Sequence, residues 1–339
     1  MFLGFQEDRD ARDCRIEESL AQEPRALTKS PLTKKLTGST VFTPTKSLHK
    51  TVAGISEQCD FANLEAELAR GKRDSLNIEL DGKKLSLTHL NKMYFSKPDL
   101  RKRDVLLYYL RIAPYILPFL KDRPLVLKRY PNGIDGKFFF QKEAPASRPE
   151  WLKTALIYSD ERKAEMPYVL AEDRADLLYL TNLGCIDQNP WSSRIDDETH
   201  PDYVFFDLDP TAGTPFATVV SVARAVYRCL EKLGVRSYLK TSGASGFHLY
   251  VPLERRYTFE QVRLFAGAIG QQVKSNLPNV VTFERHVSSR RKGTVLFDAV
   301  QNARGKPLAA PYSLRPLQGA PVSAPVSAKN YPPSCGPNA

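Results

Sequence analysis

Apolar and polar residues alternate along residues 77–87 on both sides of Asp81 and Gly82, a pattern that predicts a β-hairpin with a tight turn. Two other apolar runs, residues 204–210 and 294–298, are rich in β-branched and aromatic side chains and reach aspartates. These runs predict strands that carry acids at their ends.

Helical periodicity occurs in three segments. Residues 103–121 and 259–276 have apolar side chains three and four positions apart, and we expect Pro114 and Pro118 to kink or divide the first of these helices. The clearest amphipathic pattern covers residues 215–233, and a glycine follows it as a stop signal. Helices and strands therefore mix along the chain, which predicts the α/β (α+β) class.

Asp207 and Asp209 are separated by one leucine, so both side chains lie on one face of an extended strand. Two adjacent carboxylates are costly to bury unless a cation neutralises them, and magnesium or manganese takes oxygen ligands of this kind. Taken alone, the pattern more often marks a strand that runs into a polar turn. Asp298 ends another apolar run and could join the pair from a neighbouring strand. Three carboxylates can hold two metal ions, as nucleotidyl transfer requires.

Residues 240–250 lie between these acids and read Lys-Thr-Ser-Gly-Ala-Ser-Gly-Phe-His-Leu-Tyr. The small residues predict a turn that leads into a strand. Its backbone amides and the Ser242 hydroxyl could cradle a triphosphate, with His248 as a further donor. An ordinary turn rich in glycine and serine is the alternative, and without the flanking acids it would be preferred.

The charge of the chain favours a polyanionic partner. The sequence has 49 basic and 38 acidic residues, a formal net charge of +11. Residues 1–75 contain twelve of each, so the excess lies entirely in the remaining chain. A scattered excess is usually a solvated surface, but here it coincides with the region that carries the motifs, which favours nucleic acid.

Residues 1–75 lack the pattern of a folded domain. Ser-Pro and Thr-Pro pairs and five lysines in residues 25–51 predict a flexible, disordered arm. Acidic residues follow the first five residues at once, so we expect no signal peptide, and no run approaches the length of a membrane span. The five cysteines are widely spaced without a Cys-x-x-Cys pair, which favours reduced thiols in the cytoplasm over disulfides or structural zinc.

The order of the motifs resembles that of one known family. Asp-Leu-Asp, Thr-Ser-Gly-x-x-Gly-x-His, Asp298 with Gln301-Asn302, and Ala310-Pro311-Tyr312-Ser313-Leu314-Arg315 follow one another as in the polymerase domain of bacterial ATP-dependent DNA ligase D, of the archaeo-eukaryotic primase superfamily. Upstream segments resemble the same domain in the same order: Leu90-Asn91-Lys92, Lys102-Arg103-Asp104, residues 127–133, Phe139-Phe140-Gln141-Lys142 and residues 183–187.

The resemblance covers about residues 76–325 and leaves residues 326–339 as an irregular C-terminal tail. It implies a two-layer primase-like catalytic core with a mixed or antiparallel sheet and flanking helices. The tail itself is a departure, because the family usually continues into a further helical segment.

The resemblance also implies roles for individual residues. The acids Asp207, Asp209 and Asp298 would be catalytic and would bind two divalent cations, manganese or magnesium. Contacts to the incoming nucleotide would come from Lys128, Ser242, His248, Arg291, Gln301 and Arg315. Lys92 and Lys102 would bind the 5′-phosphate of a DNA end, although the sequence alone equally suits two ordinary surface lysines. Phe139 and Phe140 would stack on template bases, and we expect one residue of Phe138-Phe139-Phe140 to lie in the core.

The function implied is that of a template-dependent primase-polymerase, a nucleotidyltransferase that extends 3′ ends and fills gaps when double-strand breaks are repaired by non-homologous end joining. Its partners would be DNA with 5′-phosphorylated ends or gaps, nucleoside triphosphates, with ribonucleotides preferred, the end-binding protein Ku and a DNA ligase. It would act in the bacterial cytoplasm, at the nucleoid, and no membrane is involved.

Two alternatives remain open. A catalytically silent nucleic-acid-binding relative is one, because Ser245 replaces a lysine found in many relatives and the C-terminal tail is unusual. Asn189, where many relatives have a histidine, is a further departure from the family. A haloacid-dehalogenase-type phosphatase is the other, since residues 207–211 fit Asp-x-Asp-x-Thr. The sequence around Asp298 does not supply the acidic loop that such a phosphatase needs.

Overall fold

The computed structural model describes residues 53–160 and 162–326. The helices are α2 (Ala53–Arg70), α3 (Lys102–Leu120), α4 (Arg174–Asn182), α5 (Phe216–Lys232) and α6 (Phe259–Asn276), with 3₁₀ turns η1 (Val287–Ser289) and η2 (Ala299–Gln301). The strands of the first half are β1 (Ser75–Leu80), β2 (Lys83–Thr88), β3 (Met93–Phe95), β4 (Leu100–Arg101), β5 (Leu127–Arg129), β6 (Phe139–Gln141), β7 (Thr154–Ser159) and β8 (Ala164–Val169). Those of the second half are β9 (Tyr203–Pro210), β10 (Tyr238–Thr241), β11 (Phe247–Pro252), β12 (Val281–Thr282) and β13 (Val295–Phe297).

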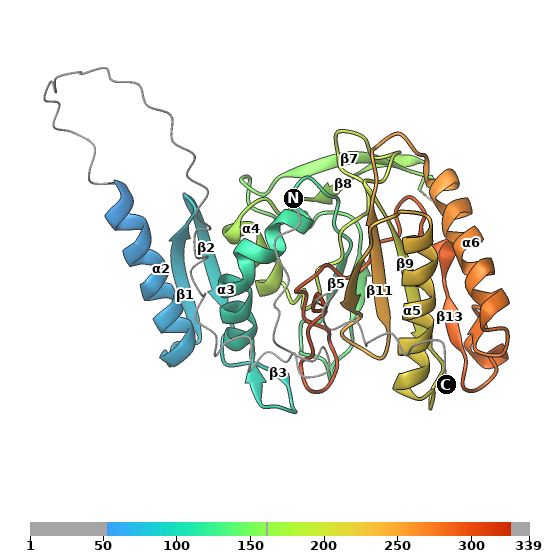
Figure 1. Ribbon diagram of the computed structural model, residues 1–339. Helices are drawn as coiled ribbons and strands as arrows, with labels where there is room; N and C mark the ends of the chain where they lie inside the picture. The colour runs from blue at the N-terminus through green and yellow to red at the C-terminus, as the bar shows by residue number, and fades with distance from the viewer. Residues whose placement is uncertain (1–52, 161, 327–339) are drawn as a thin grey trace, which may run out of the picture.

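A five-stranded mixed sheet in the order β10-β11-β9-β13-β12 forms the centre of the second half. Strand β9 runs antiparallel to both of its neighbours, and only β12 and β13 pair in parallel. Helices α5 and α6 cover one face, as Figure 1 shows at the right of the molecule. The predicted amphipathic helices and the predicted mixed sheet are thus confirmed.

Side chains of β9 alternate between the two faces of this sheet. Phe206 and Leu208 are buried against the helices, whereas Phe205 packs with Tyr250 and Leu308 on the other side. Because Asp207 and Asp209 have the same parity as Phe205, both acids lie on the face that α5 and α6 leave free.

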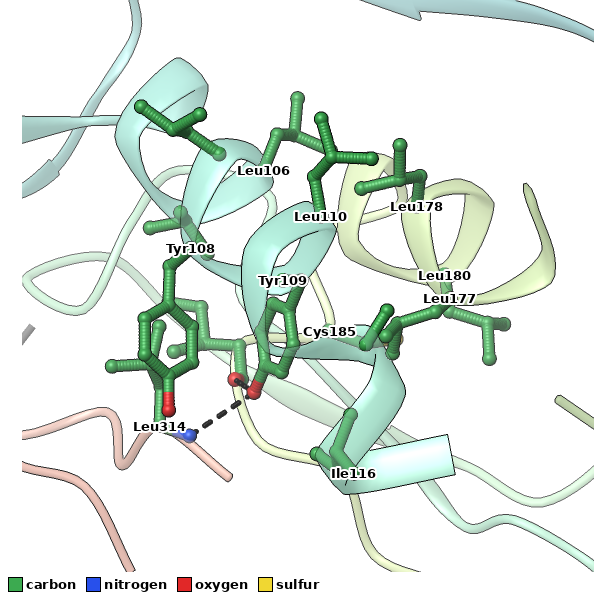
Figure 2. Close-up of a cluster of buried hydrophobic side chains, with 14 of the residues drawn as sticks. Leu106, Tyr108, Tyr109, Leu110, Ile116, Leu177, Leu178, Leu180, Cys185 and Leu314 are labelled. Carbon is green, nitrogen blue, oxygen red and sulfur yellow. Dashed lines mark hydrogen bonds between the residues drawn. The ribbon is translucent and has the colours of Figure 1, made fainter. Parts of the chain in front are cut away.

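The first half packs the hairpin β1–β2 with α2, α3 and α4 around a second core (Figure 1). Pro114 and Pro118 both lie inside α3, so they do not divide the helix as expected. Its buried face holds it together: Figure 2 shows Leu106, Leu110 and Ile116 of α3 beside leucines of α4. Tyr109 of α3 donates a hydrogen bond to Ile186 O (2.6 Å) and accepts one from Leu314 N (3.1 Å), which ties this core to the loop around Leu314.

Helix α2 corrects the prediction of a flexible arm over residues 1–75. Leu64 and Leu68 of α2 are buried in the core of the first half, at 6% and 0% exposure. The Arg103 guanidinium holds the end of the segment by donating to the carbonyls of Gly71 and Arg73. Residues 1–52 and 327–339, which contain the rest of the predicted arm and almost all of the predicted tail, lie outside the described residues.

The C-terminal segment, residues 322–326, lies along the outer edge of β10. Thr241 N donates to Ala324 O (2.8 Å), and Val326 N donates to Leu239 O (2.9 Å). Although this stretch has no apolar periodicity, its backbone bonds to the edge of β10, with an isolated bridge between Lys240 and Pro325, and it adds Ser323 to the acid-bearing face. None of the described helices is long and apolar enough to cross a membrane.

Candidate active site

The three predicted acids meet at the centre of the sheet. Asp298 directly follows β13, and its backbone N–H donates to Asp207 O (3.1 Å) on β9, so the two residues are neighbours across the strands. Burial, followed by repulsion from Asp298, raises the pKa of Asp207 to about 6. Burial, followed by repulsion from Asp207, likewise raises the pKa of Asp209 to about 6. These carboxylates are therefore held close together at a cost that a cation would offset.

The donor set fits a hard divalent cation. Asp207 Oδ1 is buried and has no hydrogen-bond partner among the described residues, and buried carboxylate oxygens normally have one. Asp298 Oδ2 accepts from Arg285 Nε (3.3 Å), and Arg285 is half exposed. Within the described ranges, however, no three His, Cys, Asp or Glu side chains lie in positions from which they could together hold a metal ion. The third acid would thus have to exchange its arginine for the cation.

Residues 242–246 form a tight turn against β9. Ser242 Oγ accepts from Ala244 N (3.1 Å) and Gly246 N (3.0 Å), and Ser242 N donates to Gly246 O (2.9 Å). A Cβ on Gly246 would lie 2.1 Å from Leu208 O, so only glycine allows this approach to the strand between the two acids. The Ser242 hydroxyl therefore holds the turn in shape, and the exposed tip is Ala244 and Ser245.

His248 and Lys240 extend the row of polar residues across the sheet. The strand register pairs Lys240 with His248 and His248 with Asp207. His248 Nε2 lies 3.3 Å from Asp207 Oδ1, and Lys240 Nζ lies 2.7 Å from His248 Nδ1. Burial lowers the pKa of both side chains well below their ordinary values, with the neighbouring positive charges adding to the effect. Lys240 had no predicted role, because its position in a strand between leucine and threonine gives no sign of these contacts.

Arg315 and Lys128 bring positive charge to this face. Arg315 Nη1 donates to Ser242 O (3.1 Å), while its Nε is buried without a partner among the described residues. Its charge lowers the pKa of Asp207 and Asp209 and also that of Lys128, so all of these groups lie within electrostatic range. Of these two predicted nucleotide contacts, Arg315 thus lies near the acids, and Lys128 lies within electrostatic range of Arg315.

The side chains of Arg291 and Gln301 donate their hydrogen bonds to backbone carbonyls and not to the three acids. Arg291 is exposed and donates to Asn279 O, whereas the charge of Arg290 next to it lowers the pKa of Asp209. Gln301 Nε2 donates to Pro307 O (3.3 Å). Sequence reasoning missed Arg285 and Arg290 as the arginines nearest the acids, because their loop has no periodicity that would reveal where each side chain points.

Lys92 and Lys102 come together at the N-terminus of α3. Lys102 N donates to Lys92 O (2.8 Å), Lys102 Nζ donates to Thr88 O (2.7 Å), and Lys92 Nζ donates to Pro131 O (3.0 Å). Burial and the charge of Lys92 lower the pKa of Lys102 to about 8. Two ammonium groups that repel each other at a helix N-terminus form a favourable place for an anion.

Phe138, Phe139 and Phe140 are all exposed, at 49%, 45% and 64%, so the expectation that one of them lies in the core is wrong. Strand β6 pairs only with β5, which leaves its aromatic side chains uncovered. Lys128 Nζ lies 4.5 Å from the centre of the Phe138 ring. Phe140 also lines a cavity of about 660 Å³ that includes Lys142, Arg148 and Arg162.

Comparison with known proteins gives one consistent result. Residues 101–334 match the family described as LigD, primase-polymerase domain. The chain is 33% identical over 244 residues to the bifunctional non-homologous end joining protein LigD of Bacillus subtilis. The aligned region covers 72% of this chain and 39% of that protein. It is 29% identical over 334 residues to the multifunctional non-homologous end joining protein LigD of Pseudomonas aeruginosa, covering 90% of this chain and 39% of that protein.

A solved structure agrees with these relatives. The polymerase domain from Mycobacterium tuberculosis ligase D in complex with DNA has 30% sequence identity and a TM-score of 0.67, covering 72% of this chain and 86% of that one. The chain therefore has the fold of that domain, and it spans about two fifths of the length of the LigD proteins from Bacillus subtilis and Pseudomonas aeruginosa.

Proposed function

Because the chain belongs to the LigD primase-polymerase domain family, we propose that it is a template-dependent nucleotidyltransferase that extends 3′ ends and fills gaps in non-homologous end joining. The observation that carries this proposal is the convergence of Asp207, Asp209 and Asp298 on the free face of the sheet, with the pKa of two of them raised to about 6. A phosphatase of the haloacid-dehalogenase type does not fit the family match.

In the proposed reaction, Asp207, Asp209 and Asp298 hold two divalent cations, manganese or magnesium. Bound there, the cations would supply positive charge to the primer 3′-hydroxyl and to the triphosphate. Asp298 would be able to serve as a ligand only after release from Arg285, a half-exposed side chain with room to move. Lys128 and Arg315 bind phosphate oxygens: the guanidinium fork of Arg315 matches paired oxygens, and the Lys128 ammonium acts as a point charge. His248 donates from Nε2 beside Asp207.

The DNA is held by the first half of the chain. Lys92 and Lys102 bind the 5′-phosphate of a gap, which distinguishes a broken strand from continuous duplex. Phe139 and Phe140 stack on template bases, because every base offers a π face to an exposed ring. The basic cavity beside Phe140 supports binding of the phosphate backbone. Ku and a DNA ligase are the proposed partners, and the bacterial cytoplasm is the proposed location.

The test is extension of a labelled primer on a gapped duplex with a 5′-phosphate, in manganese and in magnesium, with ribonucleotides and deoxyribonucleotides compared. We expect template-directed addition that Asp207→Ala abolishes. Glu260→Ala, an exposed acid on α6 at the opposite face of the sheet, is the matched control and should retain full extension. A folded chain that binds the primer-template but adds no nucleotide would instead be a silent relative.

A further inference from the structure

Lys240 is a buried lysine whose contacts the proposed reaction does not use. It is 2% exposed, and no carboxylate within the described residues forms an ion pair with its Nζ. Its Nζ instead contacts His248 Nδ1 at 2.7 Å and Ser323 Oγ. A lysine is rarely buried without a carboxylate partner, so the direction of these two hydrogen bonds matters.

The direction of each hydrogen bond follows from its neighbours. The Ser323 hydroxyl donates its only proton to Thr241 O (2.8 Å), so Ser323 Oγ accepts from Lys240 Nζ. On the other side, an amine or ammonium N–H can donate to His248 Nδ1, which leaves the ring proton on Nε2. The opposite tautomer would point the Nε2 lone pair at Asp207 Oδ1, 3.3 Å away, and two electron-rich atoms would then repel.

We infer that Lys240, anchored by Ser323 of the C-terminal segment, is a positioning residue that fixes His248 in the tautomer with its proton on Nε2. The imidazole N–H then faces the acids. At 3.3 Å its alignment leaves Asp207 Oδ1 without a hydrogen bond, so the donor stays available to another acceptor bound beside the acids. In the proposed function, which this step assumes, that acceptor is a phosphate oxygen of the nucleotide.

The C-terminal segment thereby becomes part of the site. Ser323 lies on residues 322–326, which pair with β10 through Thr241 and Leu239, so pairing of this segment sets the position of the Ser323 hydroxyl. The row Ser323, Lys240, His248 and Asp207 runs across the sheet edge to its centre. Loss of the pairing should disturb His248 without touching the acids directly.

The experiment measures the ¹⁵N chemical shifts of the two His248 ring nitrogens by NMR, in the intact ¹⁵N-labelled chain without nucleotide. Nucleotide affinity and primer extension are then measured for the same variants. Lys240→Met keeps the length of the side chain but removes the donor, Lys240→Gln restores a donor, and Ser323→Ala removes the anchor alone. We expect protonated Nε2 in the wild type, mixed tautomers in Lys240→Met, and nucleotide affinity lower by about tenfold or more in that variant. Lys240→Gln should recover part of both.

The inference is overturned if the wild-type ring carries its proton on Nδ1, or if Lys240→Met keeps the wild-type signature and affinity. Should Lys240→Met fail to fold, the wild-type spectrum and Ser323→Ala still decide the matter, since the latter should shift the tautomer partway. The NMR result stands apart from catalysis: an inactive wild type with protonated Nε2 would contradict the polymerase proposal but not the role of Lys240.

Discussion

Binding of a 5′-phosphate should weaken as the pH rises through the pKa of Lys102. Burial and the neighbouring charge of Lys92 lower this pKa to about 8, so Lys102 loses its charge in a range where ordinary lysines keep theirs. About nine tenths of the side chains are charged at pH 7 and about one tenth at pH 9. If the phosphate binds only the charged form, its contribution to affinity falls about tenfold, or about 1.4 kcal/mol.

The assay compares dissociation constants of gapped duplexes with a 5′-phosphate and a 5′-hydroxyl at each pH, because their ratio isolates the phosphate. A terminal phosphate stays largely dianionic throughout, since its second pKa is about 6. Lys102→Arg is the matched control, because a guanidinium keeps its charge and the ratio should no longer depend on pH. In Lys92→Gln the loss of the neighbouring charge should move the transition to higher pH.

A wild-type ratio that is unchanged between pH 7 and pH 9 would refute the reasoning. An equal decline in Lys102→Arg would do the same, since the titrating group would then be elsewhere.

Three further predictions concern the acids, the exposed aromatic strand and helix α2. The pKa of Asp209 is raised from 3.8 to about 6, so its ionised carboxylate lowers the stability of the fold as the pH rises through 6. Manganese should therefore raise the melting temperature at about pH 7.5 much more than at about pH 5, and Asp209→Asn should remove most of this gain in a thermal scan. Phe140→Ala should weaken binding of a template overhang about fivefold to 150-fold in an anisotropy titration without changing stability, whereas Leu156→Ala, at a similarly exposed apolar position, should leave binding intact. Leu68→Ala should lower the free energy of unfolding in urea by about 2–5 kcal/mol, and an effect no larger than that of the exposed Arg70→Ala would mean that α2 does not stabilise the fold.

Strong local patterns made much of the fold predictable. The hairpin of β1 and β2 and the helices α5 and α6 have alternating or helical apolar spacing that needs no partner to be recognised. The position of the acids followed from strand parity, which puts Asp207 and Asp209 on one face whatever the rest of the chain does.

Features that depend on distant partners were missed. Helix α2 has a weak amphipathic pattern, and Leu64 and Leu68 gain their importance only from the core around α3. One residue of Phe138-Phe139-Phe140 was expected in the core because three aromatics in a row usually lie there, yet within the described residues β6 pairs with β5 alone. Lys240 owes its contacts to Ser323, 83 residues away, which no local pattern can reveal.

The glycine turn of residues 242–246 determines where this site can change during evolution or engineering. A side chain at Gly246 would collide with the backbone of β9, and one at Gly243 would come within 2.9 Å of Ser323 N, so both positions are closed to substitution. Ala244 and Ser245 between them project into solvent and touch neither obstacle. A lysine can therefore be exchanged for serine at position 245 without reshaping the turn, so the charge at the tip of the turn can change while the backbone around it stays fixed.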